Sequence, residues 1–225
     1  MNNHAPTEET LRLAIVQVGR RLYQRGLIAA GDGNISARLP DGTIVITPAG
    51  MCKGDLEPED LVVVDTEGQL LRAAPGRRQS TEQLLHLHVY RRRPDARACV
   101  HAHPPTAVAL TLAGISMTEP FLPEAVLALG PVPTAPYART GTAEMGAAVD
   151  DLIGEHNAVL LSHHGALTLG STPLEAYYLM EQLEHCARII HAATLLGPIR
   201  RLPPERIDEL RALRQTLSAT REENG

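Results

Sequence analysis

Three histidines are the residues of this chain whose types and spacing best suit metal chemistry. His101 and His103 are separated by one alanine, and His164 lies in the run Ser162-His163-His164-Gly165. Side chains two apart in an extended segment project from the same face of a strand, so both imidazoles of the H-x-H pair can reach one ion. Imidazole is a common protein ligand for zinc, and Mn²⁺ or Co²⁺ are alternatives. Three histidines with one open position are typical of a catalytic metal site.

Other histidines compete for this role. His86 and His88 stand two apart on a predicted helix, where such residues do not face each other, so they do not form a local chelate. His163 precedes His164, and strand alternation sends the two side chains in opposite directions, so only one of them can point at a metal. Each histidine taken alone is also compatible with a structural role, in which its ring bonds to the backbone.

Six short motifs occur in an order that is typical of one enzyme family. They are Gly31-Asp32-Gly33-Asn34-Ile35-Ser36, Ile46-Thr47-Pro48-Ala49-Gly50, Ser80-Thr81-Glu82, the H-x-H pair, Ala135-Pro136-Tyr137 and His164-Gly165. In this order the chain resembles the class II aldolase/adducin family over residues 8–200. The resemblance implies a three-layer α/β/α fold around a largely antiparallel sheet. It also implies a homotetramer with a divalent metal near each subunit interface, and the histidine ligands favour Zn²⁺.

The resemblance also assigns roles to single residues. His164 matches the third metal ligand because it immediately precedes Gly165, and Glu82 falls on the position of the catalytic acid/base. Without the resemblance, Glu82 is an acidic residue favoured by a helix N-terminal dipole. The family's phosphate pocket uses the segments that contain Asn34, Gly50, Ser80 and Thr81, so we expect these four residues to bind a substrate phosphate.

Residues outside the metal motifs depart from the family pattern. Ala49 stands where sugar-phosphate aldolases of this type commonly have a hydroxyl residue, and Phe121-Leu122-Pro123-Glu124 lacks their proton-donating tyrosine. Arg139-Thr140 replaces an aromatic wall. Arg139 and Glu124 either recognise a carboxylate and a hydroxyl of the substrate or are surface residues, and the sequence leaves both readings open.

The main hypothesis is an enzyme of carbohydrate metabolism, a metal-dependent carbon–carbon lyase. It would cleave a ketose 1-phosphate similar to L-fuculose 1-phosphate, by a retro-aldol reaction, to dihydroxyacetone phosphate and an aldehyde. The alternative is a decarboxylase of the same family that acts on an oxo-acid phosphate or a hydroxyaromatic dicarboxylate. An epimerase is disfavoured because that branch carries aspartate at the position of Glu82. A metal-free, adducin-like assembly module is disfavoured because it has no use for three histidines and Glu82.

Composition fits a cytoplasmic protein that acts on small molecules. The chain has 225 residues, of which 44% are hydrophobic and 21% charged, and its net charge of −5 argues against a nucleic-acid surface. The N-terminal residues lack the basic and apolar regions of a signal peptide, and no apolar run reaches about 18 residues, so we expect neither a leader nor a membrane span. Cys52, Cys99 and Cys186 are odd in number and widely spaced, which indicates free thiols in a reducing compartment.

The expected elements alternate between helices and short strands within one domain, residues 1–225. Helical spacing predicts helices over 8–25, from Ser80 with a capping box to Gln83, from 105 to Leu112, from 172 onward and over 204–217. Alternating apolar runs bounded by turns predict strands over 35–39, 44–47, 61–65, 69–71, 98–103 and 158–163. Hairpins this close together favour antiparallel pairing.

Overall fold

One eight-stranded sheet forms the centre of the computed structural model, which describes residues 5–224 and the side chains of residues 5–217. The strands are β1 (Asn34–Arg38), β2 (Ile44–Ile46), β3 (Val62–Val64), β4 (Leu70–Arg72), β5 (Ala98–Ala102), β6 (Thr134–Ala135), β7 (Ala158–Leu161) and β8 (Gly165–Gly170). Their order across the sheet is β4-β3-β2-β1-β5-β8-β7-β6. All neighbours are antiparallel except β6 and β7, which are parallel. The expected α/β fold with a mostly antiparallel sheet is confirmed.

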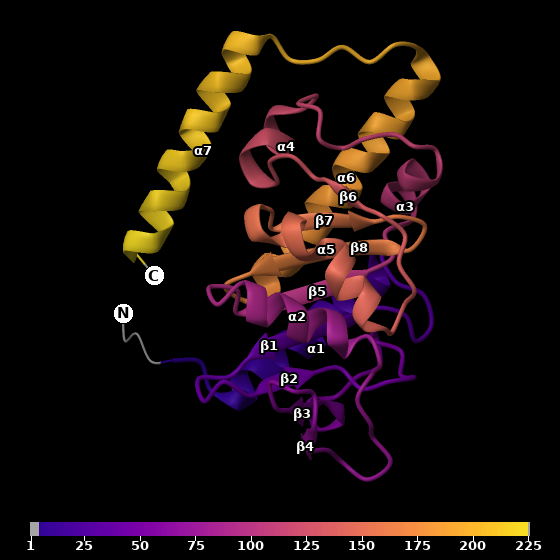
Figure 1. Cartoon of the computed structure of the whole chain (residues 1–225), viewed down its shortest axis with the longest axis vertical. Helices are drawn as coiled ribbons and strands as arrows, with labels where there is room; N and C mark the ends of the chain where they lie inside the picture. The colour runs from indigo at the N-terminus through magenta and orange to yellow at the C-terminus, as the bar shows by residue number, and fades with distance from the viewer. Residues whose placement is uncertain (1–4, 225) are drawn as a thin grey trace.

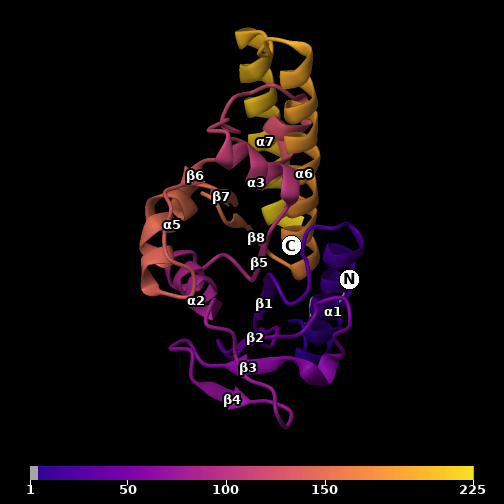
Figure 2. The ribbon, with the colours of Figure 1, turned by 90° about the vertical axis from the view of Figure 1, so that its right-hand side faces the viewer.

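The helices cover both faces of this sheet (Figure 2). They are α1 (Glu8–Gln24), α2 (Gln83–Arg92), α3 (Pro105–Leu112), α4 (Pro123–Ala128), α5 (Ala143–Glu155), α6 (Pro173–Leu196) and α7 (Pro204–Asn224), with a 3₁₀ turn at Pro58–Asp60. Residues of α1, α3 and α6 share one apolar core with alternate strand residues such as Val100. Residues of α2 and α5 share a second core with the intervening ones such as Cys99. The period of two along each strand therefore supplies both cores.

Several element boundaries follow from local signals in the sequence. Asp41 and Gly42 form the β1–β2 turn, where Asp41 Oδ1 accepts the Thr43 N–H at 2.9 Å and Gly42 has a φ of +88°. Thr172 is the N-cap of α6, and its hydroxyl oxygen accepts the Glu175 N–H at 3.1 Å. These elements match the expected hairpin and helix because the deciding contacts lie within a few residues.

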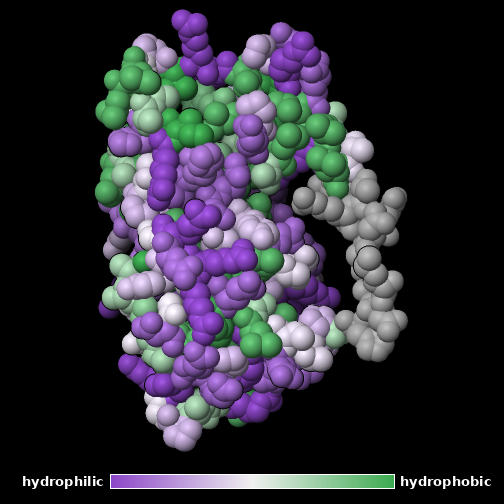
Figure 3. All heavy atoms as spheres, turned by 180° about the vertical axis from the view of Figure 1, so that it is seen from behind, coloured by the Kyte–Doolittle hydropathy of each residue, from purple (hydrophilic) through white to green (hydrophobic). Residues whose placement is uncertain are grey.

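The last helix, α7, lies against α4 at the outside of the molecule (Figure 1). Arg214 of α7 donates to the Leu129 carbonyl at 3.1 Å. Exposed apolar side chains gather at the end where α6 gives way to α7, and Leu195 and Leu196 there are 76% and 90% exposed (Figure 3). Among the described residues, no helix is both long and apolar enough to cross a membrane.

Glu184 of α6 fixes the segment that carries His103. Its buried carboxylate accepts the N–H groups of Thr106 at 3.1 Å and Ala107 at 3.0 Å, at the start of α3. We expect Glu184→Ala to lower the free energy of unfolding by about 1–3 kcal/mol, because it leaves buried donors without an acceptor. Denaturant unfolding measures this. Glu181→Ala, which removes a half-exposed carboxylate paired with Arg25, should cost less than about 1 kcal/mol, and an equal loss in both variants would contradict this role.

Candidate metal centre and active site

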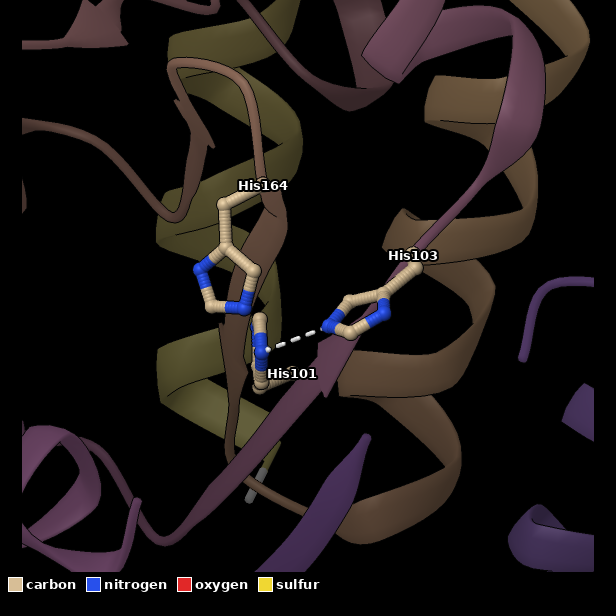
Figure 4. Close-up of side chains that lie close together, drawn as sticks. All are labelled: His101, His103 and His164. Atoms are coloured by element: carbon tan, nitrogen blue, oxygen red, sulfur yellow. Dashed lines mark hydrogen bonds between the residues drawn. The ribbon is translucent and has the colours of Figure 1, made fainter. Parts of the chain in front are cut away.

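Three histidines from two separate parts of the chain meet at one end of the sheet (Figure 4). His101 is in β5, His103 follows the end of that strand, and His164 lies in the connection between β7 and β8. One ring nitrogen of each lies within 4.8 Å of the others, and the Nε2 atoms of His101 and His103 are 3.2 Å apart. In the part of the chain that the structure describes, this is the group of three side chains suited to hold a metal ion.

The connection between β7 and β8 differs from the sequence-based expectation. We predicted a strand over 158–163, but β7 ends at Leu161 and residues 162–164 form a turn. His163 adopts a left-handed φ of +61°, its side chain is exposed, and its N–H donates to Thr111 Oγ1 at 3.1 Å. The prediction that His164 rather than His163 faces the other histidines stands, but the turn, and not strand alternation, is the physical reason.

Because Gly165 has no side chain, it leaves the space in which the three imidazole rings meet. A Cβ at this position would overlap the Ala102 carbonyl oxygen and lie 2.8 Å from His103 Cδ2 and 3.0 Å from His101 Cε1. Any side chain at this position would therefore push against two of the three imidazoles. The glycine that follows His164 has a steric role at the cluster.

Two of the three histidines, His101 and His103, are held in the neutral form that binds metals. Burial lowers the pKa of His101 to about 3 and also lowers the pKa of His103. The Ala166 carbonyl lies 2.9 Å from His101 Nδ1 and can only accept, so this nitrogen carries the hydrogen and Nε2 keeps its lone pair. The Asp32 carboxylate lies 3.5 Å from His103 Nδ1 on the far side of that ring from His101. Both H-x-H rings thus present Nε2 inward.

The donor set fits a divalent ion such as zinc. Two nitrogen ligands of a tetrahedral zinc ion lie about 3.4 Å apart, close to the 3.2 Å between the Nε2 atoms of His101 and His103. His164 Nδ1 is buried and has no hydrogen-bond partner among the described residues. Buried polar atoms without partners are rare in folded proteins. Nε2 of His164, and not this Nδ1, faces the rings of His101 and His103 (Figure 4), so it is the Nε2 side of each ring that suits a shared metal ion.

Glu82 brings a carboxylate to the same point. Its Oε1 lies 3.5 Å from His164 Nε2, and its Oε2 lies 3.8 Å from His101 Nε2. Asn34 Nδ2 donates to Oε2 at 3.1 Å. A hydrogen bond from His164 lowers the pKa of Glu82 to about 2, against the opposing effect of burial. The carboxylate is therefore ionised at neutral pH.

The start of α2 also differs from the expectation. We predicted a helix capped by Ser80 with a capping box to Gln83, but α2 begins at Gln83 and Glu82 immediately precedes it. Ser80 Oγ instead accepts the N–H of Glu82 at 3.2 Å, and the Gln83 N–H bonds to the Ser80 carbonyl at 3.1 Å. The serine therefore shapes a tight turn that holds Glu82, rather than the first turn of the helix.

The segments of the expected phosphate pocket lie side by side. Pro48 and Gln79 form an isolated antiparallel bridge, which places Gly50 near Ser80. A Cβ on Gly31 would lie 3.6 Å from the Gly50 carbonyl carbon. Asn34 is buried against Glu82, and exposed Thr81 lines a hollow of about 200 Å³. The lining of this hollow includes Thr81, Glu82, Gly141, Thr142 and His164.

Two residues beside these segments were missed in the sequence. Lys53 is almost fully buried, and this burial lowers the pKa of its ammonium group. The ammonium donates to the carbonyls of Gly31 at 2.6 Å and Met51 at 2.9 Å, and Lys53 therefore joins two of the turns. It is the single lysine in the chain, a signal that could have drawn attention to it. The sequence indicated no role for Asp32 beyond its turn, although a carboxylate beside a ligating histidine commonly orients that histidine.

Other candidates lie outside the cluster. His86 is buried beneath Glu82, and His88 bonds to Asp150 at 2.8 Å, so the exclusion of both as ligands agrees with the described geometry. Glu124 on α4 and Arg139 are both exposed, and neither belongs to the group of histidines. A larger apolar cavity between α4, α6 and α7 contains none of the expected site residues.

Comparison with known proteins places this geometry in a family. The model of the class II aldolase and adducin N-terminal domain matches residues 13–191. The chain belongs to this family.

Relatives within the family distinguish among its reactions. A 3-oxo-tetronate 4-phosphate decarboxylase of Escherichia coli strain K12 is 36% identical over 218 residues, which cover 94% of this chain and all of that protein. The crystal structure of YgbL from Klebsiella pneumoniae, a protein for which aldolase, epimerase and decarboxylase activities have been suggested, has a TM-score of 0.83 at 37% identity and covers 92% of this chain and 100% of that one. An L-fuculose 1-phosphate aldolase structure has the same TM-score of 0.83 at only 27% identity, with 94% and 98% covered.

These relatives overturn the main functional hypothesis. Retro-aldol cleavage of a ketose 1-phosphate is wrong as the leading assignment, because relatives matched over nearly the full length at 36% identity are decarboxylases. The motifs did not separate the two reactions because both of them leave a carbanion beside a carbonyl. The same histidines and carboxylate can stabilise that carbanion in either case. The metal motifs therefore identify a carbon–carbon lyase family and do not select the bond that breaks.

Proposed function

We propose that this protein is a metal-dependent decarboxylase that acts on 3-oxo-tetronate 4-phosphate or a closely similar 3-oxo-acid phosphate. The single observation that carries the proposal is 36% identity over 94% of the chain to a relative with that activity. The geometry is compatible with it, because three histidines and the ionised Glu82 converge at one point. A 3-oxo acid can lose carbon dioxide only if the electron pair left behind is accommodated.

The proposed reaction balances with a single proton. The C1–C2 bond breaks, carbon dioxide leaves, and the electron pair remains on C2, conjugated with the C3 carbonyl as an enediolate. A proton taken from solvent then adds to C2 and gives dihydroxyacetone phosphate. Glu82 is the carboxyl group placed to carry that proton, because Asn34 and His164 hold it beside the histidines. Retro-aldol cleavage of a ketose 1-phosphate passes through the same three-carbon enediolate, which explains why one site serves both.

The residues proposed to hold the metal are His101, His103 and His164. A divalent ion, Zn²⁺ with Mn²⁺ or Co²⁺ as alternatives, supplies Lewis-acid stabilisation of negative charge on the substrate oxygens when bound. The protein favours the neutral form of His101 and His103 by burial and orients His101 through the Ala166 carbonyl. Asp32 orients His103 in the same manner.

The proposed phosphate site consists of Asn34, Gly50, Ser80 and Thr81. Hydroxyl groups and backbone N–H groups in a turn suit a phosphate, which accepts hydrogen bonds only. The Ser80 hydroxyl oxygen accepts from Glu82 N–H and leaves its own hydrogen available to a ligand. The positive charge of Lys53 lies behind the adjoining turns.

Direct assay tests the reaction. Metal-loaded protein is incubated with 3-oxo-tetronate 4-phosphate labelled with ¹³C at C1, and labelled carbon dioxide and dihydroxyacetone phosphate are measured together. We expect equal amounts of the two products, and much slower cleavage of L-fuculose 1-phosphate. Absence of carbon dioxide release, or faster aldehyde release from the ketose phosphate, would overturn the proposal.

The phosphate site gives a separate prediction. We expect Ser80→Ala to raise KM about 10- to 100-fold, because a hydrogen bond to a charged group such as phosphate contributes about 1.5–3 kcal/mol, while inorganic phosphate inhibits the wild type competitively. Arg139→Ala serves as the comparison, since Arg139 is exposed and lies outside the cluster. A larger rise in KM for Arg139→Ala than for Ser80→Ala would assign substrate binding to a carboxylate contact at Arg139 instead.

The wider biological assignments belong to the same proposal. We propose a homotetramer in the cytoplasm, with one domain over residues 1–225, the three-layer arrangement implied by the family and a role in carbohydrate metabolism. The exposed Leu195 and Leu196 support self-association, because contiguous apolar surface commonly marks an interface. The three cysteines are free, as a reducing compartment favours.

A further inference from the structure

We propose that His86 is a positioning residue for Glu82, acting through Asn34 as one link of a buried hydrogen-bond relay that also contains Ser36 and Tyr90. The relay fixes the amide of Asn34 with its NH₂ group toward the carboxylate. The effect on turnover rests on the proposed function, whereas the orientation of the relay does not.

The relay is continuous from Glu82 to the interior. Asn34 Nδ2 lies 3.1 Å from Glu82 Oε2, and Asn34 Oδ1 bonds to His86 Nε2. On the other side of the ring, His86 Nδ1 lies 2.7 Å from Ser36 Oγ, which in turn lies 2.7 Å from Tyr90 Oη. The exposed fractions are 2% for Asn34, 0% for Ser36 and His86, and 5% for Tyr90, so water does not compete for these bonds.

Spacing along two elements builds the relay. Glu82, His86 and Tyr90 are four residues apart, which aligns them along one side of α2 and the turn before it. Asn34 and Ser36 are two apart on β1 and share one face of the sheet. Asn34 is also the register partner of His101 on the neighbouring strand β5, so the relay ends beside the histidine cluster.

The direction of every hydrogen bond follows from the ends of the relay. An ionised carboxylate only accepts, so Asn34 donates through Nδ2 and its Oδ1 faces His86. Oδ1 also only accepts, so His86 Nε2 carries the hydrogen. Burial lowers the pKa of His86 to about 4, so the ring is neutral and Nδ1 accepts from the Ser36 hydroxyl. Ser36 then accepts from Tyr90, whose pKa burial raises well above its usual value and which keeps its proton.

The alternative orientation of Asn34 explains why the relay matters. Rotation of the amide by a half-turn would bring its carbonyl oxygen against the Glu82 carboxylate, where two acceptors repel each other. The His86 N–H selects the same orientation from the other end of the amide, and without it the amide is held at one end only, by the contact with Glu82 itself. Glu82 would lose a donor and its fixed place beside His164 and His101.

The kinetic test compares three variants of α2. We expect His86→Leu to lower kcat about 10- to 100-fold with little change in KM, because a hydrogen bond to a charged group contributes about that factor. His86→Gln keeps an N–H near the position of Nε2 and should recover most of the loss. His88→Leu is the matched control, since His88 faces α5 and bonds to Asp150, and it should stay within about twofold of wild type. Metal content and melting temperature are measured for each variant.

A spectroscopic test does not depend on activity. Protein labelled with ¹⁵N at histidine should show a neutral His86 ring with its proton on Nε2 at pH 7, and His86→Gln identifies the signal. A proton on Nδ1 would overturn the relay, as would equal loss of kcat in His86→Leu and His86→Gln. A wild-type protein that releases no carbon dioxide would overturn the proposed function, while the tautomer of His86 would still support or overturn the relay.

Discussion

Gly165→Ala is expected to abolish divalent-metal binding and, with it, turnover. The added Cβ would overlap the Ala102 carbonyl and press on the rings of His103 and His101 at 2.8 Å and 3.0 Å. Backbone on one side, with the buried ring of His101 and the half-buried ring of His103 on the other, leaves no long flexible side chain that can move aside. Overpacking of this kind costs about 1–3 kcal/mol, and displacement of ligands by about 1 Å is enough to disrupt a preorganised site. Metal content after loading, measured by mass spectrometry, checks this expectation.

Two further variants separate metal loss from general damage. Gly154→Ala introduces a Cβ that meets only Arg92 Nη2 at 3.4 Å, so it should bind metal normally and melt at or above the wild-type temperature. His103→Gln removes a ligand without any backbone clash and should lose metal as Gly165→Ala does. Full metal occupancy and activity in Gly165→Ala would contradict the proposed arrangement of the ligands.

Glu82→Gln is expected to keep the fold and the metal but to lose most turnover. The amide cannot carry a proton to C2, and general acid–base catalysis contributes roughly 10²- to 10⁴-fold. The glutamine carbonyl can still accept from Asn34 Nδ2, so the side chain should stay in place and the loss should fall on kcat. Steady-state kinetics with the 3-oxo-acid phosphate, at measured metal occupancy, provide the test.

The control for charge is Glu67→Gln. Glu67 pairs with Arg91 of α2 at 3.5 Å on an exposed surface, so its loss removes one negative charge near the same helix without touching the site. Its kcat should stay within about twofold of wild type. If Glu82→Gln retained kcat within the same range, Glu82 would have no role in proton transfer.

The sequence by itself determined the elements whose causes are local. The apolar stripe and Gly26 set the first helix, Asp41-Gly42 set the first hairpin, and Thr172 with Pro173 set the start of α6. It also singled out His101, His103 and His164, because an H-x-H pair and a His-Gly step indicate metal ligands however far apart they lie along the chain. The family motifs predicted the mostly antiparallel α/β fold for the same reason.

The sequence predicted the reaction less well than it predicted the fold and the group of histidines. Decarboxylation and retro-aldol cleavage share an enediolate, so motifs that stabilise it are common to both, and the discriminating residues lie around the rest of the substrate. Ala49, Glu124 and Arg139 showed that this region departs from the sugar-phosphate aldolases, but a departure does not name a new substrate. Similarity over the full length of the chain supplied the correction.

Only the tertiary structure decided how distant segments complete each other. Strand alternation failed at His163 and His164 because packing of the β7–β8 turn against Thr111 admits a left-handed residue there. The capping box at Ser80 failed because its hydroxyl oxygen accepts from Glu82 instead. The orientation of Asn34 depends on His86, 52 residues away. Local sequence signals predict hydrogen bonds between residues a few positions apart. The hydrogen bonds around Asn34 exist only because β1, β5 and α2 pack together. The pattern of residues within one segment does not show which residue of another segment is buried beside it.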